Sequence, residues 1–510
     1  MSRVRAEATH RHDLLRARRL GIDTYREPVA FLRADCAVCR AEGFQALSRV
    51  RLERGGRIVI ATLNVVHGAL LSGCDLGLSE AAWQALGVRD GDVVRVGHPE
   101  AVESFAAVRS KIYGGRFDDA ALAAIIHDIN AGRYSAIEIA AFITACAGDH
   151  MSLAETLSLT RAMIAVGTRL AWHQTPIVDK HCVGGLPGNR TTPIMVAIVA
   201  ACGLTIPKTS SRAITSPAGT ADTMATLAPV DLTLEHMRRV VEREGGCVVW
   251  GGAMALSPSD DVLIQVERPL DFDSEGQLAA SIISKKIAAG STHLLIDIPV
   301  GASAKVRDAA TAARLSHRLR AVGEALGLHV RVVETDGSQP VGRGIGPALE
   351  AMDVLAVLHN APEAPADLRQ RALRLAAEVL ELAGHCASGA GLALATATLN
   401  SGAALRKFEA ICEAQGGQRR PQPAPYQREI TAEQAGVVTD IDNRRLARLA
   451  KLAGAPMSPS AGVWLAVRLG DVVSRGQPLY VLHAQSPGEL DYAAEYARSH
   501  PLLSLQKDRA

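Results

Sequence analysis

The spacing of apolar residues divides the first third of the chain into two segments. Between about residues 20 and 96, short apolar runs alternate with turn signals, as in RGGRIVIATLNVV and in GVRDGDVVRVG with its Asp-Gly turn. This pattern predicts a small, β-rich, barrel-like domain over residues 1–100. From residue 118 to 166, Ala, Ile and Leu recur at three- and four-residue spacing, and SLAE is a capping-box signature. A helical domain is therefore expected over residues 101–172.

Beyond residue 175 the pattern is typical of a sheet covered by helices. Apolar runs such as MVAIVAACGL, THLLIDIPV and HVRVVET alternate with helical segments, which predicts a large, mostly parallel α/β domain over residues 173–257 and 293–425. The helical stretch LAASIISKKIAAG interrupts this series, so we expect about residues 258–292 to pack on the helical domain and to leave a cleft. After a linker-like QGGQRRPQPAPYQ, short apolar runs predict a β-rich C-terminal domain over residues 426–510. The predicted fold class is α/β multidomain.

Composition and charge limit the classes of partner. The 510 residues are 48% hydrophobic, and 55 basic and 53 acidic residues leave a net charge of only +2. These charges are interspersed and form no basic stripe, which argues against nucleic acid and membrane partners. The Arg-rich N-terminus lacks an apolar signal region, and no run reaches the ~18 apolar residues of a membrane span. We therefore expect a cytoplasmic protein.

Nine cysteines scattered over the chain favour reduced thiols over a disulfide framework. Cys36 and Cys39 form a C-x-x-C pair. A zinc site would need further ligands nearby, and a redox site would need a thioredoxin-like setting. The simpler interpretation is a turn with two half-buried thiols.

Residues 177–223 carry the strongest chemical signal. This stretch contains two glycine- and hydroxyl-rich loops around one apolar segment, with four cations, namely Lys180, Arg190, Lys208 and Arg212. Glycine-rich loops expose backbone N–H groups and let an anion approach, while the cations neutralise its charge. The pattern predicts a phosphate site.

Four motifs in the chain resemble those of a known family. They read VDKHCVGGLPGN, KTSSRAITSPAGTADT, GCVVWGGAMALSPSDD and SIISKK, and MSLAETLSLTRAMIAVG resembles the signature of the helical domain. The chain resembles the thymidine/pyrimidine-nucleoside phosphorylases and their close relatives, the nucleoside-monophosphate (AMP) phosphorylases, from about residue 20 to the C-terminus. The N-terminal extension is similar to that of the longer branch of the family.

The resemblance implies a glycosyltransferase of the thymidine phosphorylase type. It would cleave thymidine with inorganic phosphate to thymine and 2-deoxyribose 1-phosphate. The alternative is a nucleoside 5′-monophosphate, with AMP giving base and ribose 1,5-bisphosphate. The resemblance implies no cofactor beyond phosphate as co-substrate, and a homodimer or higher homo-oligomer.

The resemblance also assigns residues to the site. The phosphate positions are Lys180, Gly184, Gly185, Thr192, Ser210 and Thr220. His181 would contact the leaving pyrimidine, where a neutral imidazole suits hydrogen bonding near pH 7, although a structural hydrogen bond is the alternative. Asp273 matches the proton donor of the AMP branch, or it could cap a helix. Cys182 stands where the shorter pyrimidine enzymes have a serine, and a thiol is a weaker donor.

A further set would bind the nucleoside. Arg268, Ser281 and Lys285 look like the base-contacting residues, and the four-residue spacing places the last two on one helix face. Arg268 could instead be a surface ion-pairing residue. Lys305 matches an additional ligand contact. The second loop comprises Ser211, Arg212, Ala213, Ile214, Thr215 and Ser216. Its hydroxyls beside an arginine would suit a 5′-phosphate.

Two other classes of protein are compatible with parts of the pattern. A phosphoribosyltransferase would share the architecture but bind Mg²⁺ through carboxylates, for which Asp260 and Asp261 are the adjacent pair in the motif region. A non-catalytic binding protein would keep the glycine loops, but the joint presence of Lys180, His181 and Lys285 argues against it. The C-terminal GDVVSRGQP lacks the lysine of a lipoyl carrier, so we expect that region to be structural.

Overall fold

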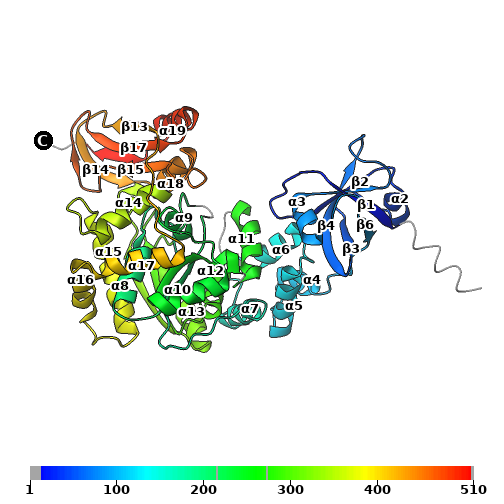
Figure 1. Cartoon of the computed structure of the whole chain (residues 1–510), viewed down its shortest axis with the longest axis horizontal. Coiled ribbons are helices and arrows are strands. Elements are labelled where there is room, and N and C mark those ends of the chain that lie inside the picture. The colour runs from blue at the N-terminus through cyan, green and yellow to red at the C-terminus, as the bar shows by residue number, and fades with distance from the viewer. Residues whose placement is uncertain (1–12, 214–215, 255, 271–273, 507–510) are drawn as a thin grey trace, which may run out of the picture. The chain divides into compact units, whose positions relative to one another are not determined.

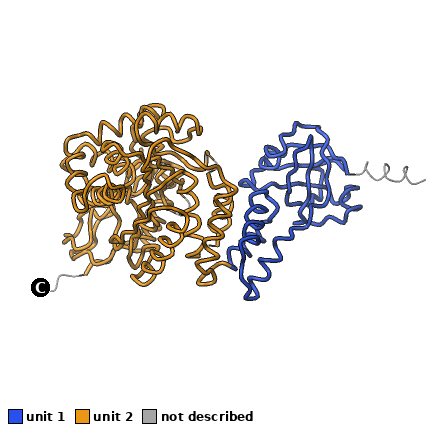
Figure 2. Tube along the Cα trace, turned by 90° about the horizontal axis from the view of Figure 1, so that it is seen from below, with its two compact units in different colours: residues 1–145 blue, residues 146–510 orange. Residues whose placement is uncertain are grey.

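The computed structural model describes residues 13–213, 216–254, 256–270 and 274–506. The chain forms two compact units, residues 1–145 and 146–510 (Figure 2). This division falls within the predicted helical domain. Its last helix, α7 (Leu153–Ala165), belongs to the second unit. The predicted domain boundaries stay a prediction.

The first unit is built on a closed barrel (Figure 1). The strands are β1 (Leu14–Arg19), β2 (Val29–Arg33), β3 (Arg49–Arg54), β4 (Arg57–Val66), β5 (Asp75–Leu78) and β6 (Val93–Gly97). They pair in the order β1-β5-β2-β4-β3-β6. Val50 and Leu52 of β3 are fully buried, whereas Arg49 and Arg51 are partly exposed, as the alternation along a strand requires. The predicted β-rich, barrel-like N-terminal domain is confirmed.

The C-x-x-C pair packs against the core of this barrel. Helix α2 (Ala37–Glu42) begins directly after Cys36, so the expected turn is a helix start. Both thiols are free and buried, and burial raises the pKa of Cys39 to about 11. A buried neutral thiol is a poor nucleophile and metal ligand. Within the described residues, no group of three or more His, Cys, Asp or Glu side chains could hold a metal ion.

Helices follow the barrel, as the sequence predicts. After β6 come α4 (Phe105–Ile112), α5 (Asp119–Asn130) and α6 (Ala136–Cys146), the last ending one residue beyond the unit boundary, whereas α3 (Glu80–Leu86) lies between β5 and β6. Asp118 caps α5 because its side chain accepts a hydrogen bond from the N–H of Ala121. Leu122, Ile125 and Ile129 lie at helical spacing and are buried.

The second unit contains a parallel sheet that carries both glycine-rich loops. Its strands are β7 (Val178–Cys182), β8 (Ile206–Ser210), β9 (Gly246–Trp250), β10 (His293–Val300) and β11 (His329–Asp336). Strands β11, β10 and β7 pair in that order, β8 pairs with β9, and a bridge between Ile177 and Thr205 joins the two groups. All these pairings are parallel. The predicted mostly parallel α/β fold is confirmed.

Helices cover both faces of this sheet (Figure 1). They are α7, α8 (Thr191–Ala201), α9 (Thr220–Ala225), α10 (Leu234–Glu244), the 3₁₀ helix η2 (Gly251–Met254), α11 (Pro258–Leu270), α12 (Glu275–Ala288), α13 (Ala309–Ala325), α14 (Pro347–Leu358), α15 (Ala366–Leu382), α16 (Gly391–Asn400) and α17 (Ala403–Gln415). Leu294 and Ile296 of β10 share a core with α12 and α13. Leu295, between them, shares a core with α8 and α15. The strand is buried on both faces, as parallel strands usually are.

Two small sheets form the C-terminal part of the second unit. Their elements are β12 (Gly344–Ile345), β13 (Tyr426–Thr431), β14 (Gly436–Ile441), α18 (Asn443–Leu452), β15 (Gly462–Leu465), β16 (Val472–Val473), β17 (Pro478–Ala484), α19 (Pro487–Ser499) and β18 (Leu503–Gln506). One sheet has the order β12-β15-β17-β13 and the other β16-β14-β18. The predicted β-rich character is confirmed. Strand β12, however, precedes the predicted boundary at residue 426, so this sheet includes a strand from the α/β domain.

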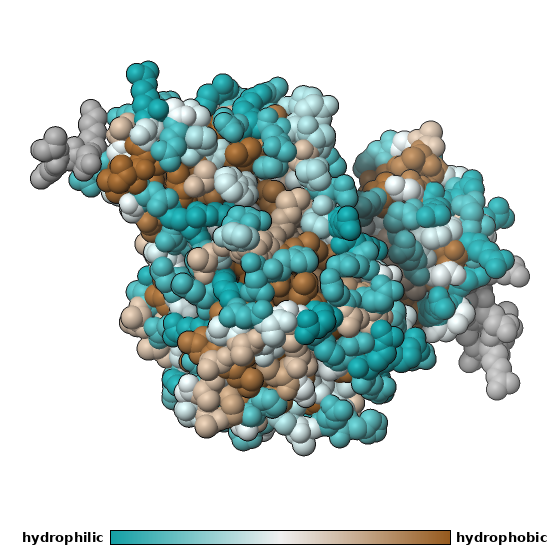
Figure 3. Space-filling model, turned by 60° about the vertical axis from the view of Figure 1, so that its left-hand side comes forward, coloured by the Kyte–Doolittle hydropathy of each residue, from teal (hydrophilic) through white to brown (hydrophobic). Residues whose placement is uncertain are grey.

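The surface mixes polar and apolar side chains. On the face shown in Figure 3, hydrophobic residues form small groups among hydrophilic ones. Exposed apolar residues of this kind are usual on protein surfaces. Among the described residues, no helix has the length and hydrophobicity that a membrane span requires.

The buried helix α8 generates a stability prediction. Every residue from Thr191 to Ala200 is buried. We expect Ile198→Ala to lower the free energy of unfolding by about 3 kcal/mol, because it removes buried methyl groups and leaves a cavity. Leu392→Ala on α16 is the matched control, since Leu392 is 52% exposed, and it should change the free energy by less than about 0.5 kcal/mol. Urea unfolding followed by tryptophan fluorescence measures both, and equal losses would contradict the central place of α8 in the core.

Candidate functional site

The two predicted loops meet in one cavity of about 240 Å³ at the carboxyl ends of β7, β8 and β9. The loop after β7 contributes residues 184–186 and 188–190, and the loop after β8 contributes Ser211, Ser216, Ala218 and Gly219. The first residues of α11 and the last turns of α12 complete the lining. Ligands of open parallel sheets bind at this edge, because the loops that follow the strands converge there.

The backbone conformation of the loop after β7 depends on two glycines. Gly184 and Gly185 have φ values of +94° and +82°, which side chains rarely adopt. A Cβ atom on Gly185 would lie 2.4 Å from the backbone nitrogen of Lys305. Glycine is therefore required here both by conformation and by space.

Three lysines and two aspartates form a buried cluster beneath the cavity. Lys286 Nζ lies 2.8 Å from Asp179 Oδ2, and Lys208 Nζ lies 3.6 Å from Asp179 Oδ1. Lys180 Nζ lies 3.6 Å from Asp297 Oδ2 and donates a hydrogen bond of 3.1 Å to Thr191. All five charged side chains are at most 6% exposed. With every group ionised, the cluster carries one uncompensated positive charge.

Within this cluster, the pKa of Lys208 is strongly lowered. Burial, together with the positive charges of Lys286 and Lys180, lowers the pKa of its ammonium group to about 7 against the opposing effect of Asp179. An anion in the cavity would favour the protonated form. A small anion in the cavity would compensate the excess positive charge of the cluster.

Several polar atoms of the described cavity lining form no hydrogen bond. Within the described part of the chain, Ser210 Oγ, Ser257 Oγ and Asn189 Oδ1 are enclosed and accept or donate no hydrogen bond. Thr192 lies in the first turn of α8, where backbone N–H groups lack helical partners and favour anions. Hydroxyl and N–H donors therefore surround the space above the lysine cluster.

The remaining cation of the first loop has its own counter-ion. Arg190 Nε lies 2.7 Å from Glu350, and Nη1 donates to Thr220 at 2.8 Å. Thr220 lines the cavity, but its hydroxyl already accepts this bond. Arg190 therefore orients the loop rather than supplying free charge.

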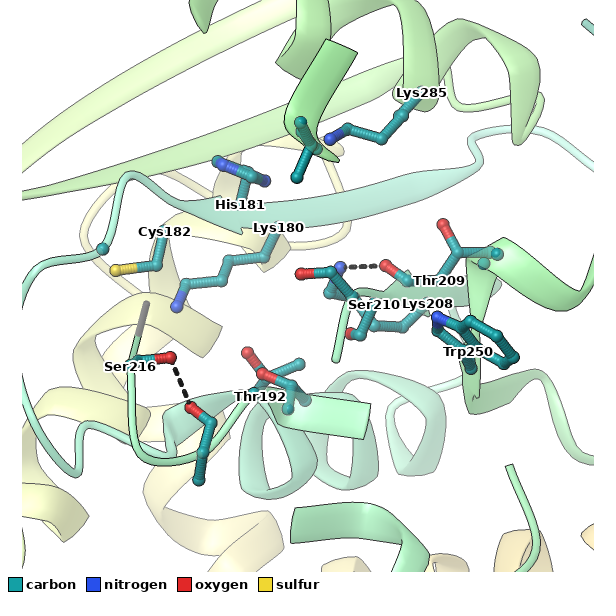
Figure 4. Close-up of a pocket in the computed structure, with 18 of the residues that line it drawn as sticks. Lys180, His181, Cys182, Thr192, Lys208, Thr209, Ser210, Ser216, Trp250 and Lys285 are labelled. Carbon is teal, nitrogen blue, oxygen red and sulfur yellow. Dashed lines mark hydrogen bonds between the residues drawn. The ribbon is translucent and has the colours of Figure 1, made fainter. Parts of the chain in front are cut away.

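Strand alternation divides the site into two sides (Figure 4). Lys180 and Cys182 lie on the side of Thr192, whereas His181 points toward Lys285. Burial, and then the positive charges of Lys286 and Lys285, lower the pKa of His181 well below its usual range. His181 is consequently a neutral imidazole that can donate one hydrogen bond and accept another.

Lys285 stands on α12 at the edge of the cavity. It donates hydrogen bonds of 2.8 Å to Asp260 Oδ2 and 3.0 Å to Ser281 Oγ. The predicted four-residue pair on one helix face is therefore in contact. Asp260, half of the pair considered for Mg²⁺, is engaged in this ion pair.

Cys182 lies on the same side of β7 as Lys180, and its thiol is protonated. Burial, followed by the charge of Asp297, raises the pKa of its thiol to about 12. Asn189 Nδ2 lies 3.5 Å from its Sγ atom. The thiol is thus a neutral and weak donor, as the sequence indicates.

The second loop is held from outside the cavity. Arg212 contacts Asp222 at 3.3 Å and Asp231 at 3.0 Å, and its guanidinium group lies 5.0 Å from the ring centre of Trp250. The N–H of Ala213 donates to Asp222 at 2.6 Å. Arg212 and Ala213 therefore shape the loop, while Ser211 and Ser216 line the cavity.

The cavity brings together ten of the residues singled out in the sequence. They are Lys180, His181, Gly184, Gly185, Thr192, Ser210, Ser211, Ser216, Thr220 and Lys285. Ser281 and Lys305 lie behind this lining, in contact with Lys285 and Gly185. Arg268 is exposed on α11 and does not line the cavity. Their individual roles stay predictions.

Three candidates, Ile214, Thr215 and Asp273, lie outside the described residues. The helix that follows Asp273, α12, is capped by Ser274, whose side chain accepts a hydrogen bond from the N–H of Gln277.

Sequence reasoning missed Lys286, Asp179 and Asp297. Lys286 directly follows Lys285, but helical spacing drew attention only to Lys285 and Ser281. Asp179 directly precedes Lys180, so a carboxylate beside a candidate phosphate lysine was a usable signal. Asp297 lies more than a hundred residues away, and only the parallel pairing of β7 with β10 places it opposite Cys182.

Three family descriptions match the chain. Residues 106–167 match the helical bundle domain of a glycosyl transferase family, and residues 174–405 match its a/b domain. Residues 437–501 match the pyrimidine nucleoside phosphorylase C-terminal domain.

Relatives extend this similarity to nearly the whole chain. A protein of Polaromonas sp. (strain JS666 / ATCC BAA-500), named "Putative thymidine phosphorylase", is 63% identical over 95% of this chain and 95% of its own length. "Putative thymidine phosphorylase 2" of Acidovorax sp. (strain JS42) is 61% identical over 96% of this chain and 95% of its own length. Among solved structures, anthranilate phosphoribosyltransferase from Thermus thermophilus is 20% identical, with a TM-score of 0.49 over 61% of this chain and 99% of that one.

The family of this chain follows from the three matching domains and from the identity and coverage of these relatives. The chain belongs to the glycosyl transferase family of the proteins named "Putative thymidine phosphorylase", with a pyrimidine nucleoside phosphorylase C-terminal domain.

Proposed function

We propose that this protein cleaves the N-glycosidic bond of a pyrimidine nucleoside with inorganic phosphate. Thymidine is the leading substrate, and the products are thymine and 2-deoxyribose 1-phosphate. The observation that supports this most is the buried cluster with one excess positive charge, set beside a neutral histidine and a lysine in one cavity. The names of the relatives fit this chemistry.

On the phosphate side, the residues would position an anion for attack. Ser210, Ser257 and the first turn of α8 would donate hydrogen bonds to phosphate oxygens, and the lysine cluster would neutralise their charge. One phosphate oxygen would then form a bond to C1′ of the pentose as the C1′–N bond breaks. Holding both reactants in line supplies much of the rate enhancement in reactions of this kind.

On the base side, the departing electron pair needs stabilisation. The pair moves from the C1′–N bond into the pyrimidine ring and onto its carbonyl oxygens. Neutral His181 would donate a hydrogen bond to one of these oxygens, and the ammonium group of Lys285 would favour the negative charge. Both groups are preorganised, because His181 is fixed on a strand and Lys285 is held by Asp260 and Ser281.

A nucleoside 5′-monophosphate is the second candidate substrate. Ser211 and Ser216 line the cavity and offer hydroxyl groups to a 5′-phosphate. Arg212, the cation expected to assist them, is instead paired with Asp222 and Asp231. This pairing favours an uncharged 5′-hydroxyl and therefore thymidine. A homo-oligomeric state and a cytoplasmic location stay predictions.

The first test follows the release of free base. Thymidine, uridine and AMP are each incubated with the protein, with and without inorganic phosphate, and the bases are separated by chromatography. We expect thymine release that requires phosphate. Adenine released only from AMP would instead establish the nucleotide reaction, and release without phosphate would contradict phosphorolysis altogether.

The second test concerns pH. Sulfate keeps its double negative charge throughout the neutral range, so changes in its affinity report the protein. Lys208, with a pKa of about 7, is charged below that pH and neutral above it. We expect the dissociation constant of sulfate to rise by about ten-fold for each pH unit above the pKa of Lys208, until other groups limit it. Titration calorimetry on both sides of that pKa measures this dependence.

Lys208→Arg is the control for this assignment, because arginine stays charged throughout the range. The variant should lose most of the pH dependence. Calorimetry in two buffers of different ionisation enthalpy gives an independent readout, since the unaltered protein should take up a proton when it binds sulfate above the pKa of Lys208. An unchanged pH profile in Lys208→Arg, or no proton uptake, would assign the titration to another group.

The third test addresses the base side. His181→Ala should lower kcat/KM for thymidine by about 100-fold, because the leaving base loses a hydrogen-bond donor. Sulfate affinity should stay within about two-fold, since His181 points toward Lys285 and away from the side of Lys180 and Thr192. Arg268→Ala is the matched control and should change kcat/KM little, because Arg268 does not line the cavity. A large loss in Arg268→Ala would restore that residue to the site.

A further inference from the structure

Two segments of the α/β domain support the phosphate loop, here defined as residues 183–190. The first support segment, residues 300–306, follows β10. Its Lys305 backbone contacts Gly185 so closely that no Cβ atom fits between them. The bridge between Val300 and Val306 closes this segment into a turn. One flank of the phosphate loop therefore rests on a second loop and not on a strand or helix.

The second support segment, residues 337–346, contacts the other flank. The N–H of Asn189 donates to the carbonyl oxygen of Val341 at 2.8 Å. Gly188 forms a parallel bridge with Val341, and a Cβ atom on Gly188 would lie 2.3 Å from that carbonyl. The position of the second segment thus sets the position of Gly188 and Asn189.

One side chain of the C-terminal domain joins the two support segments. Asn443, the first residue of α18, donates from Nδ2 to Ser303 Oγ at 2.9 Å and to the carbonyl oxygen of Gly337 at 3.1 Å. Ser303 belongs to the first segment and Gly337 to the second. Asn443 is only 1% exposed, so water cannot replace these bonds.

Further contacts with the C-terminal domain fix the second segment along its length. Strand β12 within it pairs with β15. Arg468 donates to the carbonyl oxygen of Pro340 at 2.6 Å, and the N–H of Leu469 donates to the side chain of Gln339 at 3.0 Å. The segment is therefore attached to the C-terminal domain on one side and to the phosphate loop on the other.

We propose that Asn443 is a positioning residue for the phosphate loop, and that the C-terminal domain sets the geometry of the anion site through the two support segments. Asn443 acts through Ser303 and Gly337 and touches neither substrate. The inference rests on the proposed function only in taking phosphate as the natural anion.

The phosphate loop is restrained by the first support segment at Gly185 and by the second at Gly188. Both support segments are loops, and each holds one flank of a loop that itself has four residues at positive φ, namely Gly184, Gly185, Gly188 and Asn189. The N–H of Gly337 also donates to the carbonyl oxygen of Val300 at 2.9 Å, so the two segments stay joined where they leave β10 and β11. Without the side chain of Asn443, the turn around Ser303 loses its hydrogen bond to α18 and its indirect link to Gly337, so the two flanks of the phosphate loop can shift relative to each other. Small displacements of this kind lower affinity and rate strongly, by up to about 100-fold for a shift near 1 Å.

The experiment compares anion binding with nucleoside binding in the full chain. Asn443→Ala should raise the dissociation constant of inorganic phosphate, measured by titration calorimetry, by about ten-fold, and KM for phosphate should rise in parallel. KM for thymidine should change less than about two-fold, because the hydrogen bonds of Lys285 go to Asp260 and Ser281 and not to either support segment. Ser303→Ala should reproduce the effect, and Ser303→Thr, which keeps the hydroxyl acceptor, should retain the affinity.

Ser486→Ala is the matched control for stability. Ser486 caps α19 in the same C-terminal domain, and its hydrogen bonds go to Glu489 of the capping box rather than to either support segment. Its loss should cost about 1 kcal/mol of stability and leave phosphate affinity unchanged. Equal losses of phosphate affinity in Ser486→Ala and Asn443→Ala would overturn the positioning role, as would an unchanged affinity in Asn443→Ala.

The outcome separates this inference from the proposed function. If the unaltered protein binds phosphate but cleaves no nucleoside, the proposed function fails, while the effect of Asn443→Ala on phosphate affinity still decides the positioning role. If thymidine is cleaved normally but Asn443→Ala binds phosphate as tightly as the unaltered protein, the positioning role alone fails. The double variant Asn443→Ala/Ser303→Ala should lose no more affinity than either single variant, because both remove the same bridge.

Discussion

The structure of the site depends on an imbalance of buried charge. Three ammonium groups share an apolar interior with two carboxylates, at the ends of strands that are otherwise lined by Val, Leu and Ile. Burying a charge without a partner costs several kcal/mol, of the order of the whole stability of a domain. The fold limits this cost by letting Lys208 approach neutrality and by leaving space for an anion. Glycine loops, unpaired hydroxyls and the N-terminus of α8 all surround that space.

The same charges determine the chemistry of the other side. Because His181 lies between buried lysines, its protonated form is strongly disfavoured, and the imidazole keeps one N–H and one free lone pair. The alternation along β7 directs His181 toward Lys285 of α12, while its neighbours Lys180 and Cys182 point to the side of Thr192 of α8. The two sides of the cavity are thus joined by a single strand, β7, whose side chains alternate between them.

Much of this arrangement was accessible from the sequence. Short apolar runs between turn signals predicted the barrel and the β-rich C-terminal region. Apolar runs between helical segments predicted the parallel sheet, because strands buried on both faces are apolar along their length. The glycine and hydroxyl spacing predicted both loops of the cavity, since few other sequences suit backbone that approaches an anion. Partners distant in sequence were not accessible. The pairing of Lys180 with Asp297 depends on strand register, and the bridge from Asn443 to Ser303 depends on the packing of α18 against a loop more than a hundred residues earlier.

The linker before residue 426 looks like a boundary between independent modules, yet β12 lies on the wrong side of it. This two-residue strand supplies an edge of the C-terminal sheet while belonging, in sequence, to the body of the α/β domain. A fragment cut at the linker would leave β15 with an open edge, which is prone to pair with other chains. Recombination at this point would likewise separate a sheet from its own strand. The C-terminal sheet is therefore complete only together with the α/β domain, and a division of the chain at the linker removes one of its strands.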